Sequence, residues 1–225
     1  FPKLTSYGFI PKTLDGDGEL RLYQHDADFS IRLGNVELMN IRMHGSEDAL
    51  AQIACEEMGY APAARVLIGG LGMGFTLRAA LDALPADAKV IVAELMPAVV
   101  KWNREILSKV AGNPLADKRV KIHEEDGVDL IRTGRGGYNA ILLDVDNGPQ
   151  KLFQKDNDRL YNTKGLFDAY AALRPGGVLA VWSSGPDYFF PRRLQKTGFV
   201  VEEIKVRARA GMKGGGHHII WLARR

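Results

Sequence analysis

Short, mostly apolar runs alternate with segments of helical spacing along most of this 225-residue chain. Apolar strands that alternate with helices are typical of a parallel sheet covered on both faces. The pattern predicts seven strands, of which the last two close the domain as a hairpin. They are residues 65–68, 89–93, 120–122, 139–143, 178–182, 200–207 and 218–223. The predicted fold class is therefore α/β, with a doubly wound, mostly parallel seven-stranded sheet.

Residues 1–45 follow a different pattern. Short β-like pieces are separated by glycine and asparagine turn signals, as at Gly34-Asn35, and predict a small antiparallel region. A helix is expected over 49–58, with Ser46 as its N-cap. We expect a β-hairpin region at 1–45 and a Rossmann-like domain at 46–225.

Composition and charge narrow the classes of protein to consider. The 46% hydrophobic and 25% charged residues are those of an ordinary globular chain. A net charge of +3 is too small a bias to favour a nucleic-acid partner. Cys55 is the single cysteine, so we expect neither a disulfide framework nor a thiolate metal site, and a cytoplasmic location is the default. No apolar run approaches the ~18 residues of a membrane span, so no membrane association is expected.

A glycine-rich loop follows the first strand of the predicted parallel sheet. It reads Gly69-Gly70-Leu71-Gly72-Met73-Gly74. Glycine allows a tight turn and close approach of the backbone to a ligand, and the helix that follows offers free N–H groups. Ligands of open α/β sheets bind beyond the carboxyl ends of the strands. The loop is therefore a candidate binding loop.

Acidic residues follow the next three predicted strands. Glu94 comes 20 residues after the loop, the spacing expected of a carboxylate that binds ribose hydroxyls. Asp126 could accept a hydrogen bond from an adenine amino group or cap the helix that begins at Val128. Asp144 and Asp146 could bind a cationic amine, accept its proton, or hold a metal. Metal is the least favoured, because no histidine or third acid stands nearby in the sequence.

This order of motifs resembles the class I S-adenosylmethionine-dependent methyltransferase fold and, within it, the spermidine synthase (polyamine aminopropyltransferase) family. The local matches are residues 74–78, 94–100 and Leu160-Tyr161 leading into 173–177. The resemblance implies S-adenosylmethionine or its decarboxylated form as cofactor, a small amine as acceptor, and a possible homodimer.

The resemblance also assigns roles by position. It implies that Asp144 is catalytic and helps to deprotonate the attacking amine. The implied cofactor-binding residues are Gly70, Gly72, Met73, Gly74, Glu94, Leu95, Asp126 and Gly127. The implied acceptor-binding residues are Asp146, Asn147, Glu47 and Tyr161.

Three departures from the family pattern concern the transferred group and its acceptor. Met73 stands where the family has an aspartate. The resemblance implies that this aspartate binds the amine of the decarboxylated cofactor, so the methionine at this position favours methyl transfer. Asn147 replaces the second aspartate of the D-x-x-D-P motif, and 45–47 reads Gly-Ser-Glu in place of Tyr-His-Glu. We therefore expect methyl or aminopropyl transfer, with methyl slightly favoured. The alternative is a non-catalytic nucleoside-binding relative that has lost the polyamine site.

Overall fold

The computed structural model describes residues 5–9, 19–145, 149, 158–209 and 216–225. Its N-terminal part is a four-stranded antiparallel sheet in the order β1-β2-β3-β4. The strands are β1 (Thr5–Phe9), β2 (Leu20–His25), β3 (Asp28–Leu33) and β4 (Val36–Asn40). The predicted antiparallel region is thus present, with β1 as an additional strand that the turn pattern did not indicate.

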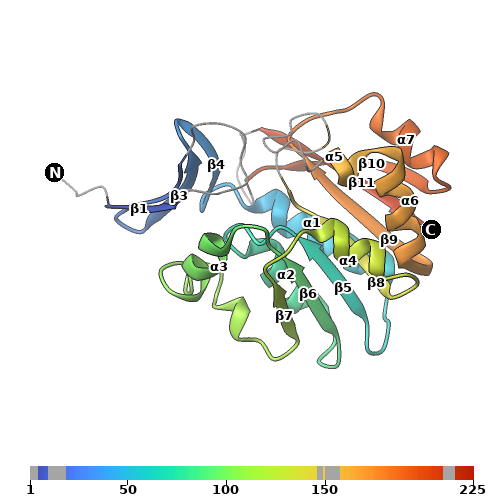
Figure 1. Cartoon of the computed structure of the whole chain (residues 1–225), viewed down its shortest axis with the longest axis horizontal. Coiled ribbons are helices and arrows are strands. Elements are labelled where there is room, and N and C mark those ends of the chain that lie inside the picture. Colours follow the sequence, from blue (N-terminus) through green and yellow to red (C-terminus); the bar gives the residue numbers. More distant parts are fainter. Residues whose placement is uncertain (1–4, 10–18, 146–148, 150–157, 210–215) are drawn as a thin grey trace.

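The rest of the chain forms a seven-stranded sheet in the order β10-β11-β9-β8-β5-β6-β7. Its strands are β5 (Arg65–Gly69), β6 (Lys89–Ala93), β7 (Val120–His123), β8 (Tyr138–Leu143), β9 (Leu173–Ser183), β10 (Val200–Arg207) and β11 (His217–Arg224). The five strands β5 to β9 run parallel, and β11 pairs antiparallel with both β9 and β10. The predicted fold class is confirmed. Figure 1 shows the blue N-terminal sheet at the far end of the molecule from the C-terminus.

Helices cover both faces of this sheet because its strands are apolar on both sides. They are α1 (Gly45–Met58), α2 (Phe75–Ala83), α3 (Pro97–Arg104), α4 (Gly127–Thr133), α5 (Asp158–Tyr161), α6 (Thr163–Ala172) and α7 (Phe190–Lys196), with a 3₁₀ turn at Pro114–Ala116. Successive residues of β5 alternate between two cores: Val66 and Ile68 pack with α1, α2 and α3, whereas Leu67 packs with α4, α6 and α7. Among the described residues, no helix has both the length and the apolar character needed to cross a bilayer.

Three local predictions differ from the structure. The sequence pattern predicts a helix from about Ala98 to Val110, whereas α3 ends at Arg104. Strand β9 begins at Leu173 rather than at residue 178, and its pairing with β8 jumps from Leu173 to Val178. Ser46 does not cap α1, because the N-cap is His44 and makes no side-chain cap bond, and Ser46 makes tertiary hydrogen bonds instead.

The sheet topology sets the position of the site. From β5 the chain crosses to β6 on one side and returns to β8 on the other. At the carboxyl ends of β5 and β8, Asp144 N–H donates to the Gly69 carbonyl over 2.9 Å. This reversal of strand order is where open α/β sheets bind ligands. The predicted glycine loop and the predicted acids meet there.

Candidate active site

Two adjoining cavities open beside this strand reversal. The first, here called the strand-end cavity, is lined by residues that include Gly70, Glu94, Leu95, Asp126 and Gly127. The second, the side cavity, is lined by residues that include Glu47, Trp182, Ser184 and His218. Four residues line both: Leu38, Met39, Gly72 and Asp144. Asp144 therefore borders both spaces.

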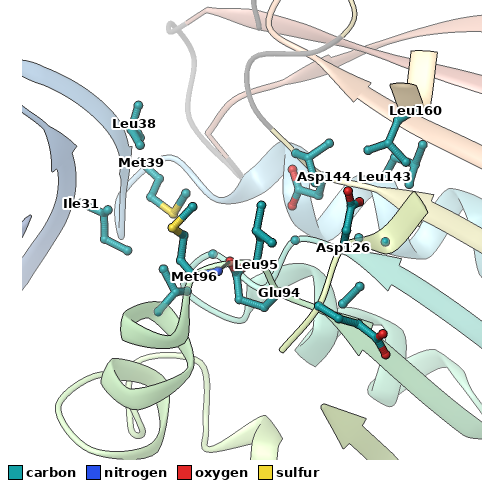
Figure 2. A pocket seen from close by; sticks show the side chains of 18 of the residues that line it. Ile31, Leu38, Met39, Glu94, Leu95, Met96, Asp126, Leu143, Asp144 and Leu160 are labelled. Atoms are coloured by element: carbon teal, nitrogen blue, oxygen red, sulfur yellow. Dashed lines mark hydrogen bonds between the residues drawn. The ribbon is translucent and has the colours of Figure 1, made fainter. Parts of the chain in front are cut away.

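The N-terminal sheet supplies an apolar wall of the strand-end cavity. Leu20, Ile31, Leu33, Leu38 and Met39 line it from β2, β3 and β4. Figure 2 shows Met39 extending from this sheet toward the side of the cavity where Glu94 follows β6. Sequence reasoning missed this wall, because alternating apolar residues in a small sheet do not indicate which part of the molecule they cover.

The glycine loop needs its glycines for two different reasons. Gly70 has φ +88°, and a Cβ there would collide with the backbone carbonyl of Asp144. Gly72 has φ +52°, and its Cβ would lie 3.2 Å from Met39 Sδ, at the boundary between the two cavities. Both conformations favour glycine. The loop therefore keeps the backbone close to β8 and the boundary open.

Glu94 is held rigidly at the end of β6. Its Oε2 accepts from Leu71 N–H over 2.9 Å and its Oε1 accepts from Met96 N–H over 2.8 Å. Burial raises the pKa of Glu94, and these backbone donors oppose the rise. Each carboxylate oxygen has a second lone pair, so Glu94 can still accept from two hydroxyl groups.

Asp126 caps helix α4, one of the two alternatives left open by its position. Its Oδ1 accepts from Val128 N–H over 2.8 Å, and its Oδ2 is ion-paired with Arg159 of α5. Asp126 and Gly127 nevertheless line the strand-end cavity. An amino group that bonds Asp126 there would share the carboxylate with Arg159.

Asp144 and Glu47 are two carboxyls on one cavity. Burial raises the pKa of Asp144 to about 6, opposed by a 2.6 Å hydrogen bond from Thr76 Oγ1. Burial also raises the pKa of Glu47, and the charges of Asp144 and Asp48 add to the rise. Like charges in a shared, poorly solvated space resist double ionisation. The pair is therefore suited to take up a cation or a proton.

Three of the predicted contact residues line neither cavity. Met73 is 1% exposed and lies in the core with α1 and α2. Gly74 is the N-cap of α2, and a Cβ there would press on Asn103 and Pro114. Tyr161 is fully buried, and its hydroxyl donates to the Val145 carbonyl over 3.1 Å. In this structure these residues shape the loops around the site from within the protein.

Two further predicted residues, Asp146 and Asn147, lie outside the described residues. Conversely, sequence reasoning did not select Ser46, Trp182 and His218 for the site. Trp182 Nε1–H donates to Ser46 Oγ over 3.0 Å, and Ser46 Oγ lies 2.8 Å from His218 Nδ1. These residues are far apart in sequence, and the only available signal was the placement of Trp182 and His218 at strand ends.

Comparisons with known proteins agree with this fold. No family model matches the chain. Over 125 residues it is 30% identical to a polyamine aminopropyltransferase of Prochlorococcus marinus (strain MIT 9312), a match covering 55% of this chain and 42% of the relative. A polyamine aminopropyltransferase of Sulfolobus acidocaldarius is 28% identical over 123 residues, covering 55% and 39% of the two chains. The matched segment is thus less than half the length of these curated relatives.

Solved structures show the same architecture over nearly the whole chain. Spermidine synthase from Thermotoga maritima superposes with a TM-score of 0.75 at 18% identity, covering 97% of this chain and 72% of that one. A spermidine synthase in complex with the transition-state analogue AdoDATO gives 0.77 at 19% identity, with the same coverage. A didemethyltoxoflavin N1-methyltransferase from Burkholderia thailandensis gives 0.56 at 17% identity, covering 80% and 79%. The resemblance to spermidine synthases and to the class I methyltransferase fold is confirmed.

Proposed function

We propose that this chain is a transferase that moves an aminopropyl group from decarboxylated S-adenosylmethionine to an amine acceptor. The observation that carries the proposal is the charge of the two cavities. Their described lining residues include the acids Glu47, Glu94, Glu125, Asp126 and Asp144, and neither lysine nor arginine is among them. A cationic ligand is favoured in such a space, and a carboxylate-bearing one is disfavoured. The similarity to polyamine aminopropyltransferases supports the same choice.

The strand-end cavity fits a nucleoside. Glu94 offers two lone pairs to ribose hydroxyls from a position fixed by Leu71 and Met96. Gly70 and Gly72 keep the loop backbone close to the ligand, and Leu95 and Gly127 add lining surface. When bound, the cofactor would supply a carbon activated by a cationic sulfur.

The side cavity fits the acceptor. An amine with a pKa near 10 is almost wholly protonated at pH 7, and its deprotonation costs on the order of 4 kcal/mol. Asp144 can take that proton because its raised pKa makes its carboxylate a better base. The nitrogen lone pair can then form a bond to the activated carbon, while the electrons of the carbon–sulfur bond leave on sulfur. Glu47 and Asp144 hold the nitrogen in line for this displacement.

Methyl transfer is the second candidate, since Met73 replaces the family aspartate. The Met73 side chain is buried in the core rather than in either cavity. Met73 therefore supports methyl transfer only because the family's aspartate is absent, and its side chain makes no contact that would favour a carboxylate-bearing cofactor. For this reason we place aminopropyl transfer first.

The test is calorimetric titration of the protein with each form of the cofactor, followed by product analysis with amine acceptors. We expect tighter binding of the decarboxylated form and release of methylthioadenosine on turnover. Tighter binding of S-adenosylmethionine with a methylated product would refute aminopropyl transfer. Binding without turnover on every amine would favour the non-catalytic alternative. The homodimer, the domain boundary at 45/46 and the cytoplasmic location stay predictions.

A further inference from the structure

A hydrogen-bonded chain fixes the protonation of a histidine at the side cavity. Trp182 Nε1 can only donate, so the Ser46 oxygen accepts from it. Ser46 is 1% exposed, and His218 Nδ1 is the other described atom within hydrogen-bond distance of its hydroxyl. A buried hydroxyl hydrogen is left unsatisfied unless an acceptor takes it. His218 Nδ1 is therefore the acceptor, and the proton of the neutral ring is on Nε2.

The surroundings keep His218 in this neutral form. Protonation at Nδ1 would turn both partners of the 2.8 Å contact into donors and leave the buried Ser46 hydrogen without an acceptor. Burial and the neighbouring His217 also lower the pKa of His218. The Trp182 ring, whose centroid lies 4.6 Å from that of His218 in an edge arrangement, holds the imidazole in place.

The side cavity thus has two chemically different regions. Asp144 provides negative charge, with Glu47 as the second carboxyl of the pair, whereas His218, which lines the same cavity, carries its ring proton on Nε2. Glu37, the acid that lines this cavity from β4, is already bound to Arg32 over 2.8 Å and to Asn40 Nδ2 over 2.8 Å. An ammonium group suits the carboxyls but finds a donor, not an acceptor, at His218.

We propose that His218 is a specificity-determining residue that selects acceptors carrying an amine at one end and a neutral hydrogen-bond-accepting oxygen at the other. Amino alcohols are then preferred over diamines of the same length. The inference rests on the proposed function, because it assumes that the amine occupies the Asp144 region. It names the acceptor class, which the similarity to known enzymes leaves open.

The first experiment compares kcat/KM for 4-aminobutan-1-ol and 1,4-diaminobutane, and for the corresponding three-carbon pair. We expect the amino alcohol to be preferred by about tenfold. Its oxygen gains a hydrogen bond from His218 Nε2–H, whereas the ammonium of the diamine leaves that donor without an acceptor. His218→Asp should reverse the preference, and Ser46→Ala should weaken it. The matched control is His25→Asp, since His25 is exposed and lines neither the strand-end cavity nor the side cavity. A diamine preference in the native protein, or an unchanged ratio in His218→Asp, would overturn the inference.

A second measurement does not depend on turnover. Nitrogen NMR of the histidine rings should show the Nε2–H form at His218, and loss of that single form in Ser46→Ala. In the protein saturated with methylthioadenosine, 4-aminobutan-1-ol should shift the His218 Nε2 resonance more than 1,4-diaminobutane does. If no acceptor is turned over but this shift is seen, the proposed function fails and the inference stands. If the ring is protonated on Nδ1, or the diamine gives the larger shift, the inference fails whatever the turnover.

Discussion

Replacing Asp144 with asparagine should make the protein more stable and less active. The carboxyl has an ordinary pKa of 3.8, which the fold raises to about 6. Because the folded form binds the proton more tightly, ionisation of Asp144 favours unfolding wherever the pH exceeds the unfolded pKa. The destabilisation is fully present above pH 6 and fades as the pH falls toward 4. Its size at pH 8 is about 3 kcal/mol.

Asparagine is neutral at every pH and can still accept the hydrogen bond from Thr76 Oγ1. Asp144→Asn should therefore raise the free energy of unfolding by up to about 3 kcal/mol at pH 8 and by less than about 1 kcal/mol at pH 4. Urea denaturation at pH 8, 6 and 4 measures this difference directly. Turnover should drop sharply in the variant. In the native protein it should fall as the pH drops through about 6, where Asp144 becomes protonated and cannot accept a proton.

Asp82→Asn is the matched control. Its side chain is 63% exposed and pairs with Arg78 one helical turn away, so the change should alter stability by roughly 0.5 kcal/mol or less. A gain in Asp144→Asn that does not depend on pH would refute a titrating carboxyl as its cause. A loss of stability at pH 8 would show that the Asp144 charge is better compensated than its burial indicates.

Three further predictions concern the cofactor side of the site. Glu94→Gln should weaken cofactor binding roughly 10- to 100-fold in calorimetry, because a charged acceptor is lost; an unchanged affinity would remove Glu94 from the ribose site. Gly72→Ala should lower both stability and cofactor affinity, since φ is +52° and the new Cβ meets Met39. The control is Gly136→Ala, where φ is +57° and the space is open; it should lower stability alone, by about 1 kcal/mol. Arg159→Ala should tighten cofactor binding, because it releases Asp126 from its ion pair. The free energy of unfolding measured in urea should change little, because the arginine is exposed. Weaker binding would indicate that Arg159 itself helps to hold the ligand.

The order of strands and helices followed from the sequence because it depends on local patterns. The continuous apolar run Ile141-Leu142-Leu143 predicts a strand buried on both faces, as it is in β8. The positions of Glu94 and Asp144 followed for the same reason, since the carboxyl ends of parallel strands meet at one edge. Where several local signals competed, as at Ser46, the predicted helix cap gave way to tertiary hydrogen bonds.

The shape and chemistry of the two cavities were decided by contacts between distant segments. Met73 lies within the glycine loop, yet its side chain packs into the core, so its replacement of an acid could not be interpreted from sequence alone. Met39 reaches the site from a separate sheet, and His218 meets Ser46 across 172 positions of the chain. Local patterns determine which residues are buried and where strands end. Which side chains share a cavity, and hence their pKa and their hydrogen-bond roles, depends on packing that only the folded chain specifies.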